Sequence, residues 1–145
     1  AAGTAMVGTL NGVTFTDATT LKPTFSNFYP AATTPANSED ITAFVNDDPF
    51  QEYIIASDAS LGGTLALRKS KIGLTYATTA AAGSTTTGKS SIQLGISTGA
   101  TTAKQLRVVR VAEDPENQDQ TAANCSLVVK VNLHQYTVGS LATGI

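Results

Sequence analysis

The fold is encoded most clearly by residues 125–136, whose sequence is CSLVVKVNLHQY. Successive side chains of a β-strand point to opposite faces, so its alternation predicts a strand with one dry and one solvent-facing surface. The dry surface comprises Cys125, Leu127, Val129, Val131 and Leu133. The wet surface comprises Ser126, Lys130, Asn132, His134 and Tyr136. Val128 is the exception to the pattern.

Strand-like patterns also precede this stretch. They cover residues 64–68, 72–77, 92–97 and 106–111, the last being apolar on both faces apart from its two arginines. Turns rich in Gly, Thr, Ser and Ala, and one acidic loop at 113–121, separate them. Short strands at this spacing predict a mainly β protein with little helix, in which residues 50–137 form an antiparallel meander.

The N-terminal part carries a turn signal and a proline-rich stretch. Asn11-Gly12 separates two short alternating runs, and both residues tolerate the positive φ of a type I′ turn, so residues 5–17 are predicted to form a tight β-hairpin. Residues 18–49 hold four of the five prolines and are predicted to be irregular, with a short strand or helical turn at 41–45. Residues 48–55 fit either a capped helix or a strand.

Size and composition point to one domain. The chain has 145 residues, of which only 14% are charged, and it is treated as a single β-rich domain over 1–145. It contains no apolar run of about 18 residues, so no membrane helix is expected, and its start does not resemble a signal peptide. The single cysteine, Cys125, excludes an intrachain disulfide and leaves an intersubunit bridge open.

Charge is strongly segregated beneath a net charge of −2. Residues 1–67 hold most of the acids and only Lys22 as a base, whereas 68–112 hold seven bases and no acid. Such asymmetry suggests a polyanionic partner, and amide, imidazole and aromatic groups beside cations suit unpaired RNA. We therefore assign candidate RNA contacts to Arg68, Lys69, Lys71, Lys89, Gln93, Lys104, Arg107, Arg110, Lys130, Asn132, His134 and Tyr136. Two alternatives remain: the bases pair with carboxylates of the same or a neighbouring chain, or they are ordinary solubilising charge.

No motif indicates an enzyme. Residues 83–90 match the phosphate-loop pattern, but the residues after Lys89 alternate like a strand, whereas nucleotide binding needs a helix there. His134 is the only histidine, and it is predicted to face away from Cys125 on the same strand. We predict no catalytic residue, no cofactor and no metal site.

Residues 61–145, taken with Asn11-Gly12, resemble the coat proteins of single-stranded RNA bacteriophages. The ending LVVKVNLHQYT at 127–137 is similar to the final strand of that family. The resemblance implies an N-terminal hairpin, and sheet strands at 72–78, 89–97 and 126–136 that face the genome. By position it implies genome contacts for Lys89, Gln93, Lys130 and Asn132. The two helices that follow the last strand in that family have no counterpart in Val138–Ile145. Either such a subunit locks its dimer differently, or the resemblance extends only to the β-meander.

The expected function is therefore a coat protein of a virion, assembled in the host cytoplasm. Dimers would build a shell and contact single-stranded RNA through a basic sheet face. The alternative is a fibre, pilus or surface-layer subunit with no nucleic-acid binding, since sparse charge and abundant Thr suit any self-packing surface. A carbohydrate-binding sandwich is disfavoured by the absence of Trp.

Overall fold

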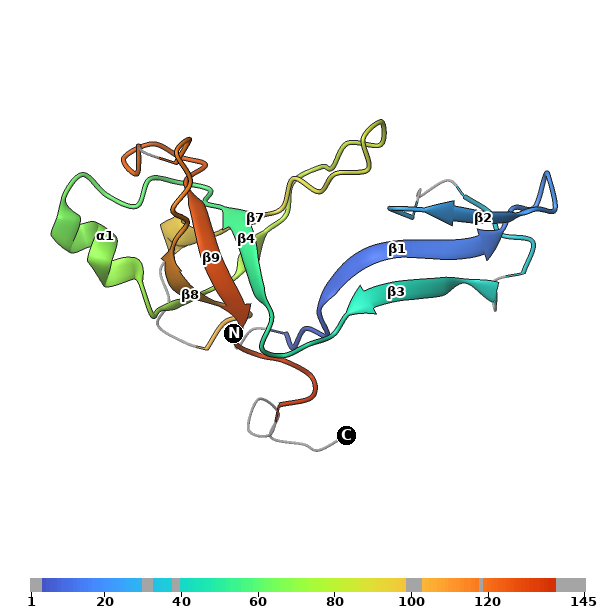
Figure 1. Ribbon diagram of the computed structural model, residues 1–145, viewed down its shortest axis with the longest axis horizontal. Coiled ribbons are helices and arrows are strands. Elements are labelled where there is room, and N and C mark those ends of the chain that lie inside the picture. The colour runs from blue at the N-terminus through green and yellow to red at the C-terminus, as the bar shows by residue number, and fades with distance from the viewer. Residues whose placement is uncertain (1–3, 30–32, 38–39, 99–102, 118, 138–145) are drawn as a thin grey trace.

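The chain folds into two sheet-based parts, shown in a computed structural model (Figure 1). The structure describes residues 4–29, 33–37, 40–98, 103–117 and 119–137. The first part, here called the arm, is a three-stranded sheet in the order β2-β1-β3, with β1 at Thr9–Thr16, β2 at Pro23–Ser26 and β3 at Thr42–Asn46. All its strand pairs are antiparallel. The arm extends to one side of the remaining chain.

The second part, here called the body, contains a four-stranded antiparallel sheet in the order β4-β9-β8-β5. Its strands are β4 (Glu52–Ala56), β5 (Thr75–Tyr76), β8 (Leu106–Val111) and β9 (Ser126–Val131). A separate two-stranded ladder joins β6 (Thr78–Thr79) to β7 (Gln93–Leu94). The helix α1 (Leu65–Lys71) and the 3₁₀ helix η2 (Ile96–Thr98) complete the described elements. The predicted mainly β, antiparallel class with little helix is confirmed.

The predicted tight hairpin at Asn11-Gly12 is wrong. Both residues lie inside β1, and Asn11 is the extra residue of a bulge in the pairing with β3. Neither has the positive φ that a type I′ turn requires. A Cβ on Gly12 would stand 2.7 Å from the Phe25 ring, so this glycine makes room for a side chain that crosses the strand. The N-terminal hairpin does form, but between β1 and β2, with its turn at residues 17–22.

The proline-rich stretch is more regular than predicted. It contains β2, whose first residue is Pro23, and this edge position tolerates a residue without a backbone N–H. Of the two readings at 41–45, the strand is correct, as β3. For residues 48–55 the strand is also correct, as β4, which begins at Glu52. Asp48 Oδ1 accepts a hydrogen bond from the Phe50 N–H at 2.8 Å, but this bond closes a turn rather than starting a helix.

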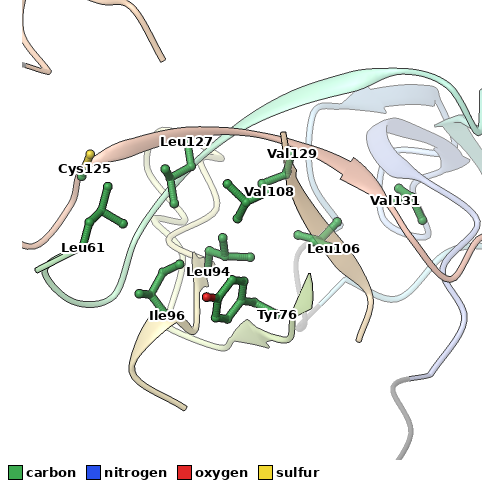
Figure 2. Packing of buried hydrophobic residues seen from close by; sticks show 10 residues of the cluster. All are labelled: Leu61, Tyr76, Leu94, Ile96, Leu106, Val108, Cys125, Leu127, Val129 and Val131. Atoms are coloured by element: carbon green, nitrogen blue, oxygen red, sulfur yellow. The ribbon is translucent and has the colours of Figure 1, made fainter. Parts of the chain in front are cut away.

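The main core lies on one face of the body sheet (Figure 2). Inward side chains of β8 and β9 meet residues from β5, β7, η2 and the loop after β4. The cluster comprises Leu61, Tyr76, Leu94, Ile96, Leu106, Val108, Cys125, Leu127, Val129 and Val131. The dry side predicted for residues 125–131 is thereby confirmed.

The strand order departs from a simple meander. A meander places strands side by side in chain order, whereas β9 lies between β8 and β4, so the last strand is central. The central position shields Val128, which lies on the outer face but is buried. Its register partners, Ile54 on β4 and Arg110 on β8, flank it from both neighbouring strands.

The strand predicted at residues 64–68 is wrong, because these residues begin α1. Thr64 caps the helix by accepting a hydrogen bond from the Leu67 N–H at 3.3 Å, and basic residues occupy the last turn. The helix buries none of its residues, so its Leu, Ala, Arg and Lys content decided the conformation rather than packing. A two-residue alternation of leucines is too short to distinguish strand from helix.

The strands predicted at 72–77 and 92–97 are also shorter than expected. Within the first, only Thr75–Tyr76 forms a strand, which pairs with β8. Within the second, only Gln93–Leu94 does so, and it pairs with Thr78–Thr79. Gly73, with φ at 83°, separates the end of α1 from β5. No helix follows the phosphate-loop match within the described residues 84–98 except the single 3₁₀ turn η2, so the strand–loop–helix context of a nucleotide site is missing there. In the described part of the chain, no helix has the length and apolarity needed to cross a membrane.

Candidate nucleic-acid interface

The body sheet has an outer face, opposite the core, on which basic side chains gather. The register places Glu52 of β4 beside Lys130 of β9, Lys130 beside Arg107 of β8, and Arg107 beside Thr75 of β5. Cross-strand partners point to the same face, so these four side chains form one line across the sheet. Arg110 lies on the same face, opposite Val128, because a bulge at Val109 restores the alternation.

We call Arg107, Arg110 and Lys130 the cationic row. Neighbouring strands are about 4.8 Å apart, so cations that stand side by side on β8 and β9 are spaced closely enough to contact the same short stretch of a polyanion. Arg107 is exposed, and the side chains of Arg110 and Lys130 are 51% and 41% exposed. The row is therefore accessible from solvent while the other face of the same strands is sealed in the core.

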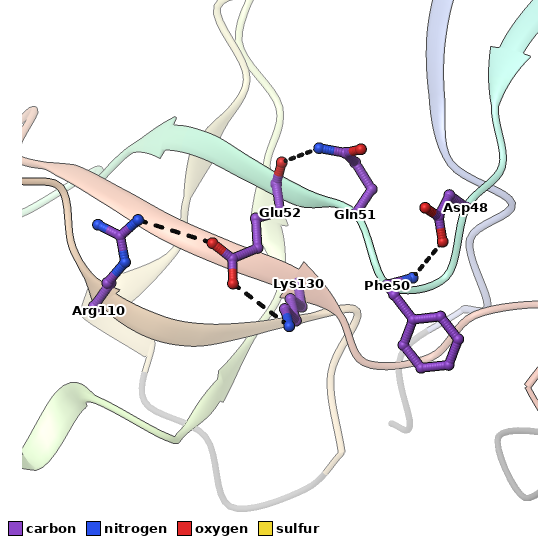
Figure 3. A network of polar contacts seen from close by, with 6 residues as sticks. All are labelled: Asp48, Phe50, Gln51, Glu52, Arg110 and Lys130. Carbon is purple, nitrogen blue, oxygen red and sulfur yellow. Dashed lines mark hydrogen bonds and ion pairs between the residues drawn. The ribbon is translucent and has the colours of Figure 1, made fainter.

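One carboxylate contacts two members of the row (Figure 3). Glu52 Oε1 lies 3.4 Å from Lys130 Nζ, and Glu52 Oε2 lies 3.9 Å from the Arg110 guanidinium. The Glu52 side chain is itself 40% exposed, so these pairs are solvated and contribute little to folding. Their main effect is local: they offset part of the positive charge of the row.

Arg107 differs from the other two members. It stands directly opposite Lys130, and like charges in this position repel each other. Among the residues that the structure describes, no carboxylate forms an ion pair with Arg107. The row thus keeps one cation whose charge is not offset by a neighbouring carboxylate.

Apolar side chains accompany the row. Ile54, between Glu52 and the end of β4, is 71% exposed on the outer face, and Phe50, two residues before Glu52, is 76% exposed. An exposed ring beside cations suits stacking of an unpaired base. Neither Glu52 nor Phe50 was among the predicted contact residues. The only indication of these two residues in the sequence is the charge of Glu52, an acidic residue in a strand that pairs with a strand carrying Lys130.

The three basic residues of α1 are separate from the row in the fold. Arg68, Lys69 and Lys71 lie on the helix, whose last turn they make positive. Arg68 is close enough to Asp119 for its charge to help lower the pKa of that carboxyl, although hydrogen bonds from Thr121 are the larger cause. The alternative in which bases pair with carboxylates of the same chain is instead represented by the ion pairs of Glu52 with Lys130 and Arg110.

Three further predicted residues serve loop and backbone contacts. Asn132 Nδ2 donates to the Lys104 carbonyl at 3.0 Å, which joins the residues flanking β9 and β8. Gln93 Nε2 donates to Asn124 Oδ1 at 2.5 Å, which links β7 to the residue before Cys125. Lys89 belongs to the loop between β6 and β7, where its carbonyl accepts from the Ser84 N–H at 2.9 Å.

The prediction that His134 faces solvent is wrong. It is 0% exposed, and its Nδ1 accepts a hydrogen bond from the Tyr136 N–H at 3.1 Å. Strand β9 ends at Val131, so the alternation that held up to that residue no longer decides which side chains face outward. The N-terminal segment covers this region, since the Met6 N–H donates to the Leu133 carbonyl at 2.8 Å. Tyr136 is exposed and its ring lies 5.4 Å from that of His134.

The single cysteine is a core residue. Cys125 is buried, and burial is the main cause that raises the pKa of its thiol. Its backbone N–H donates to Ser57 Oγ at 3.1 Å, which anchors the start of β9 to the loop after β4. A thiol in this position is poorly placed for an intersubunit disulfide.

Comparisons were made with models of protein families, with curated proteins and with solved structures, and none gave a match. The functional inference therefore depends on the surfaces of this chain alone.

Proposed function

We propose that this chain is a structural coat subunit of a virion, which assembles with copies of itself into a shell and contacts genomic RNA through the outer face of the body sheet. The observation that carries the proposal is the pairing of two uncovered surfaces on one small chain: an aromatic patch on the arm and a cationic row on the body. A shell subunit needs both kinds of surface, one toward its neighbours and one toward the genome.

The aromatic patch supports self-assembly. Phe25 of β2 and Phe44 of β3 meet across Gly12, with ring centroids 6.3 Å apart, and they are 65% and 47% exposed. Burying one such side chain contributes roughly 1.5–3 kcal/mol. An exposed pair on a sheet that projects from the body is an expected contact for a second copy, and in a closed shell the gain repeats at every equivalent interface.

The cationic row supports RNA contact. Arg107 and Lys130 stand side by side on a solvent-facing sheet surface, with Arg110 nearby and an exposed Phe50 before β4. Cations bind phosphate oxygens, and a ring offers a platform to a base, which together recognise single-stranded RNA with little sequence preference. This surface is smaller than the one predicted from the sequence, because it contains only three of its basic residues.

A fibre, pilus or surface-layer subunit is the second candidate. The observation that favours it is the pairing of Glu52 with Lys130 and Arg110, because this reduces the positive charge of the row. The aromatic patch would serve such a polymer equally well. The two candidates differ in whether nucleic acid accompanies the assembled protein.

Electron microscopy of the expressed protein, together with its absorbance at 260 nm before and after ribonuclease treatment, tests the proposal. Closed particles with nuclease-sensitive absorbance are expected for a coat protein. Filaments or sheets without nucleic acid would support the second candidate, and monomers under all conditions would contradict both.

A variant pair tests the role of the patch. Phe25→Ser is expected to reduce particle yield strongly, whereas Leu65→Ser removes a similarly exposed apolar side chain from α1, outside the arm, and should leave assembly intact. Equal effects of the two substitutions would show that the arm patch has no special part in assembly. Circular dichroism of both variants checks that their sheets remain folded.

A further inference from the structure

The contact between Glu52 and the cationic row has a consequence for ligand binding. Glu52 is the carboxylate that the described residues bring into ion-pair contact with the row, and it contacts both Lys130 and Arg110. Carboxylate and phosphate oxygens bind the same N–H donors in similar geometry. A phosphate group that approaches these two cations therefore competes with the carboxylate.

The surroundings of Glu52 allow its carboxylate to be displaced. Its side chain is 40% exposed and belongs to the edge strand β4. Figure 3 shows its carboxylate lying between the Arg110 and Lys130 side chains. The backbone carbonyl of Glu52 is held separately, by Gln51 Nε2 at 2.9 Å. The side chain can thus change rotamer without breaking the strand pairing.

We propose that Glu52 is a built-in competitor of RNA phosphate, which lowers the affinity of the single subunit for RNA and is displaced when the row binds. This inference depends on the proposed RNA contact and specifies how that contact is regulated. Arg107, which has no carboxylate partner among the described residues, makes the first phosphate contact. Lys130 and Arg110 then exchange Glu52 for further phosphates of the same strand.

Replacement of Glu52 by phosphate favours the binding of long RNA strands over single phosphates, and of assembled protein over single subunits. A single phosphate gains little by replacing a carboxylate that is already in place, whereas a strand held at Arg107 presents its next phosphates at high effective concentration. Many subunits in one assembly multiply this effect. An isolated subunit should therefore bind RNA weakly.

Glu52→Gln tests the inference, because it removes the charge and keeps the shape. The readout is fluorescence anisotropy of a labelled single-stranded RNA of about 20 nucleotides, measured with the purified protein at several salt concentrations. The variant should bind about tenfold more tightly at low salt, and the slope of log K against log salt should steepen by roughly 0.7 for each recovered phosphate contact. The matched control is Glu116→Gln, which makes the same chemical change in an exposed loop and should have a much smaller effect.

A double substitution separates local competition from general charge. With Lys130 and Arg110 both changed to Gln, adding Glu52→Gln should no longer raise the affinity, because the competing contacts are already absent. Equal gains from Glu52→Gln and Glu116→Gln, or an unchanged salt slope, would overturn the role of Glu52 while leaving RNA binding intact. Failure of both wild type and Glu52→Gln to bind RNA would overturn the RNA contact itself. Matching thermal transitions of all the variants verify that folding is unchanged.

Discussion

The arm and the body are both small antiparallel sheets, yet they bury their residues differently. In the body, one face of the four-stranded sheet is sealed by residues of β7, η2 and the loop after β4 (Figure 2). In the arm, Val13 and Phe15 are buried on one face, but Phe25 and Phe44 remain exposed on the other. The body therefore holds the main core, while the arm keeps part of its apolar surface for contacts with other molecules. An alternating strand pattern therefore predicts which side chains share a face, but not what covers that face.

The largest effect is expected in the body core. Leu127→Ala, at a residue only 1% exposed, should lower the free energy of unfolding by about 2–5 kcal/mol, because it leaves a cavity in packed surroundings. The Ile54 side chain, on the adjacent strand β4, points to the outer face. Ile54→Ala should therefore change the free energy of unfolding by no more than about 0.5 kcal/mol. Urea denaturation of both variants measures the difference. Similar losses for both would contradict the assignment of the two faces.

A smaller effect is expected in the arm, at Gly12. Gly12→Ala places a Cβ against the Phe25 ring and should cost about 1 kcal/mol by forcing the ring aside. Gly63→Ala, where a Cβ would meet nothing within 4 Å, serves as the control. In a Phe25→Ala background the cost of Gly12→Ala should largely disappear. Its persistence there would point to a backbone requirement at Gly12 instead of side-chain crowding.

The turn between β1 and β2 should respond weakly to acid. Asp17 Oδ1 accepts from the Thr20 N–H at 2.7 Å and from the Thr20 hydroxyl at 3.0 Å, and these bonds hold the pKa of Asp17 below its ordinary value of 3.8. A lowered pKa means that the stabilisation is present above the unfolded value and is lost as the pH falls through the folded one. The Thr20 amide resonance should therefore titrate with a midpoint below 3.8. A midpoint at or above it would exclude this turn.

Labelling of Cys125 tests the burial of the body core without any change to its sequence. Because burial raises the pKa of its thiol, the native protein should react with a thiol reagent at neutral pH far more slowly than the unfolded chain. Leu127→Ala, by opening the core beside β9, should accelerate the reaction. Fast labelling of the native wild type would show that the start of β9 is exposed.

Much of the body could be predicted from local patterns. The alternation over residues 125–131 predicted both β9 and its buried face, and 106–111 predicted β8, since long apolar alternation has few competing explanations. The prediction of a strand at 64–68 was wrong because two alternating leucines carry less information than the Thr64 cap and the helix-forming residues that follow it. The hairpin failed because Asn-Gly also suits a bulge, and the choice depended on Phe25, a residue thirteen positions away.

The candidate site was only partly predictable. Charge segregation identified a basic segment, but three of its cations lie on α1 and only two, Arg107 and Arg110, belong to the cationic row, whose third member is Lys130 of β9. Which side chains become neighbours depends on strand register, and register places Glu52 beside Lys130 although they are far apart in the chain. The alternation predicted that His134 faces solvent, but its side chain is buried. The reason is that β9 ends before His134 and the N-terminal segment covers this region.

Local preferences along the chain are enough to set the mainly β class of the protein, since alternating apolar residues favour strands wherever they occur. Three features arise only from the folded arrangement: β9 is central, Gly12 lies beneath two aromatic rings, and Glu52 lies among the cations. These features depend on which distant segments pair, and that choice is made by the burial of whole faces rather than by any residue and its immediate neighbours.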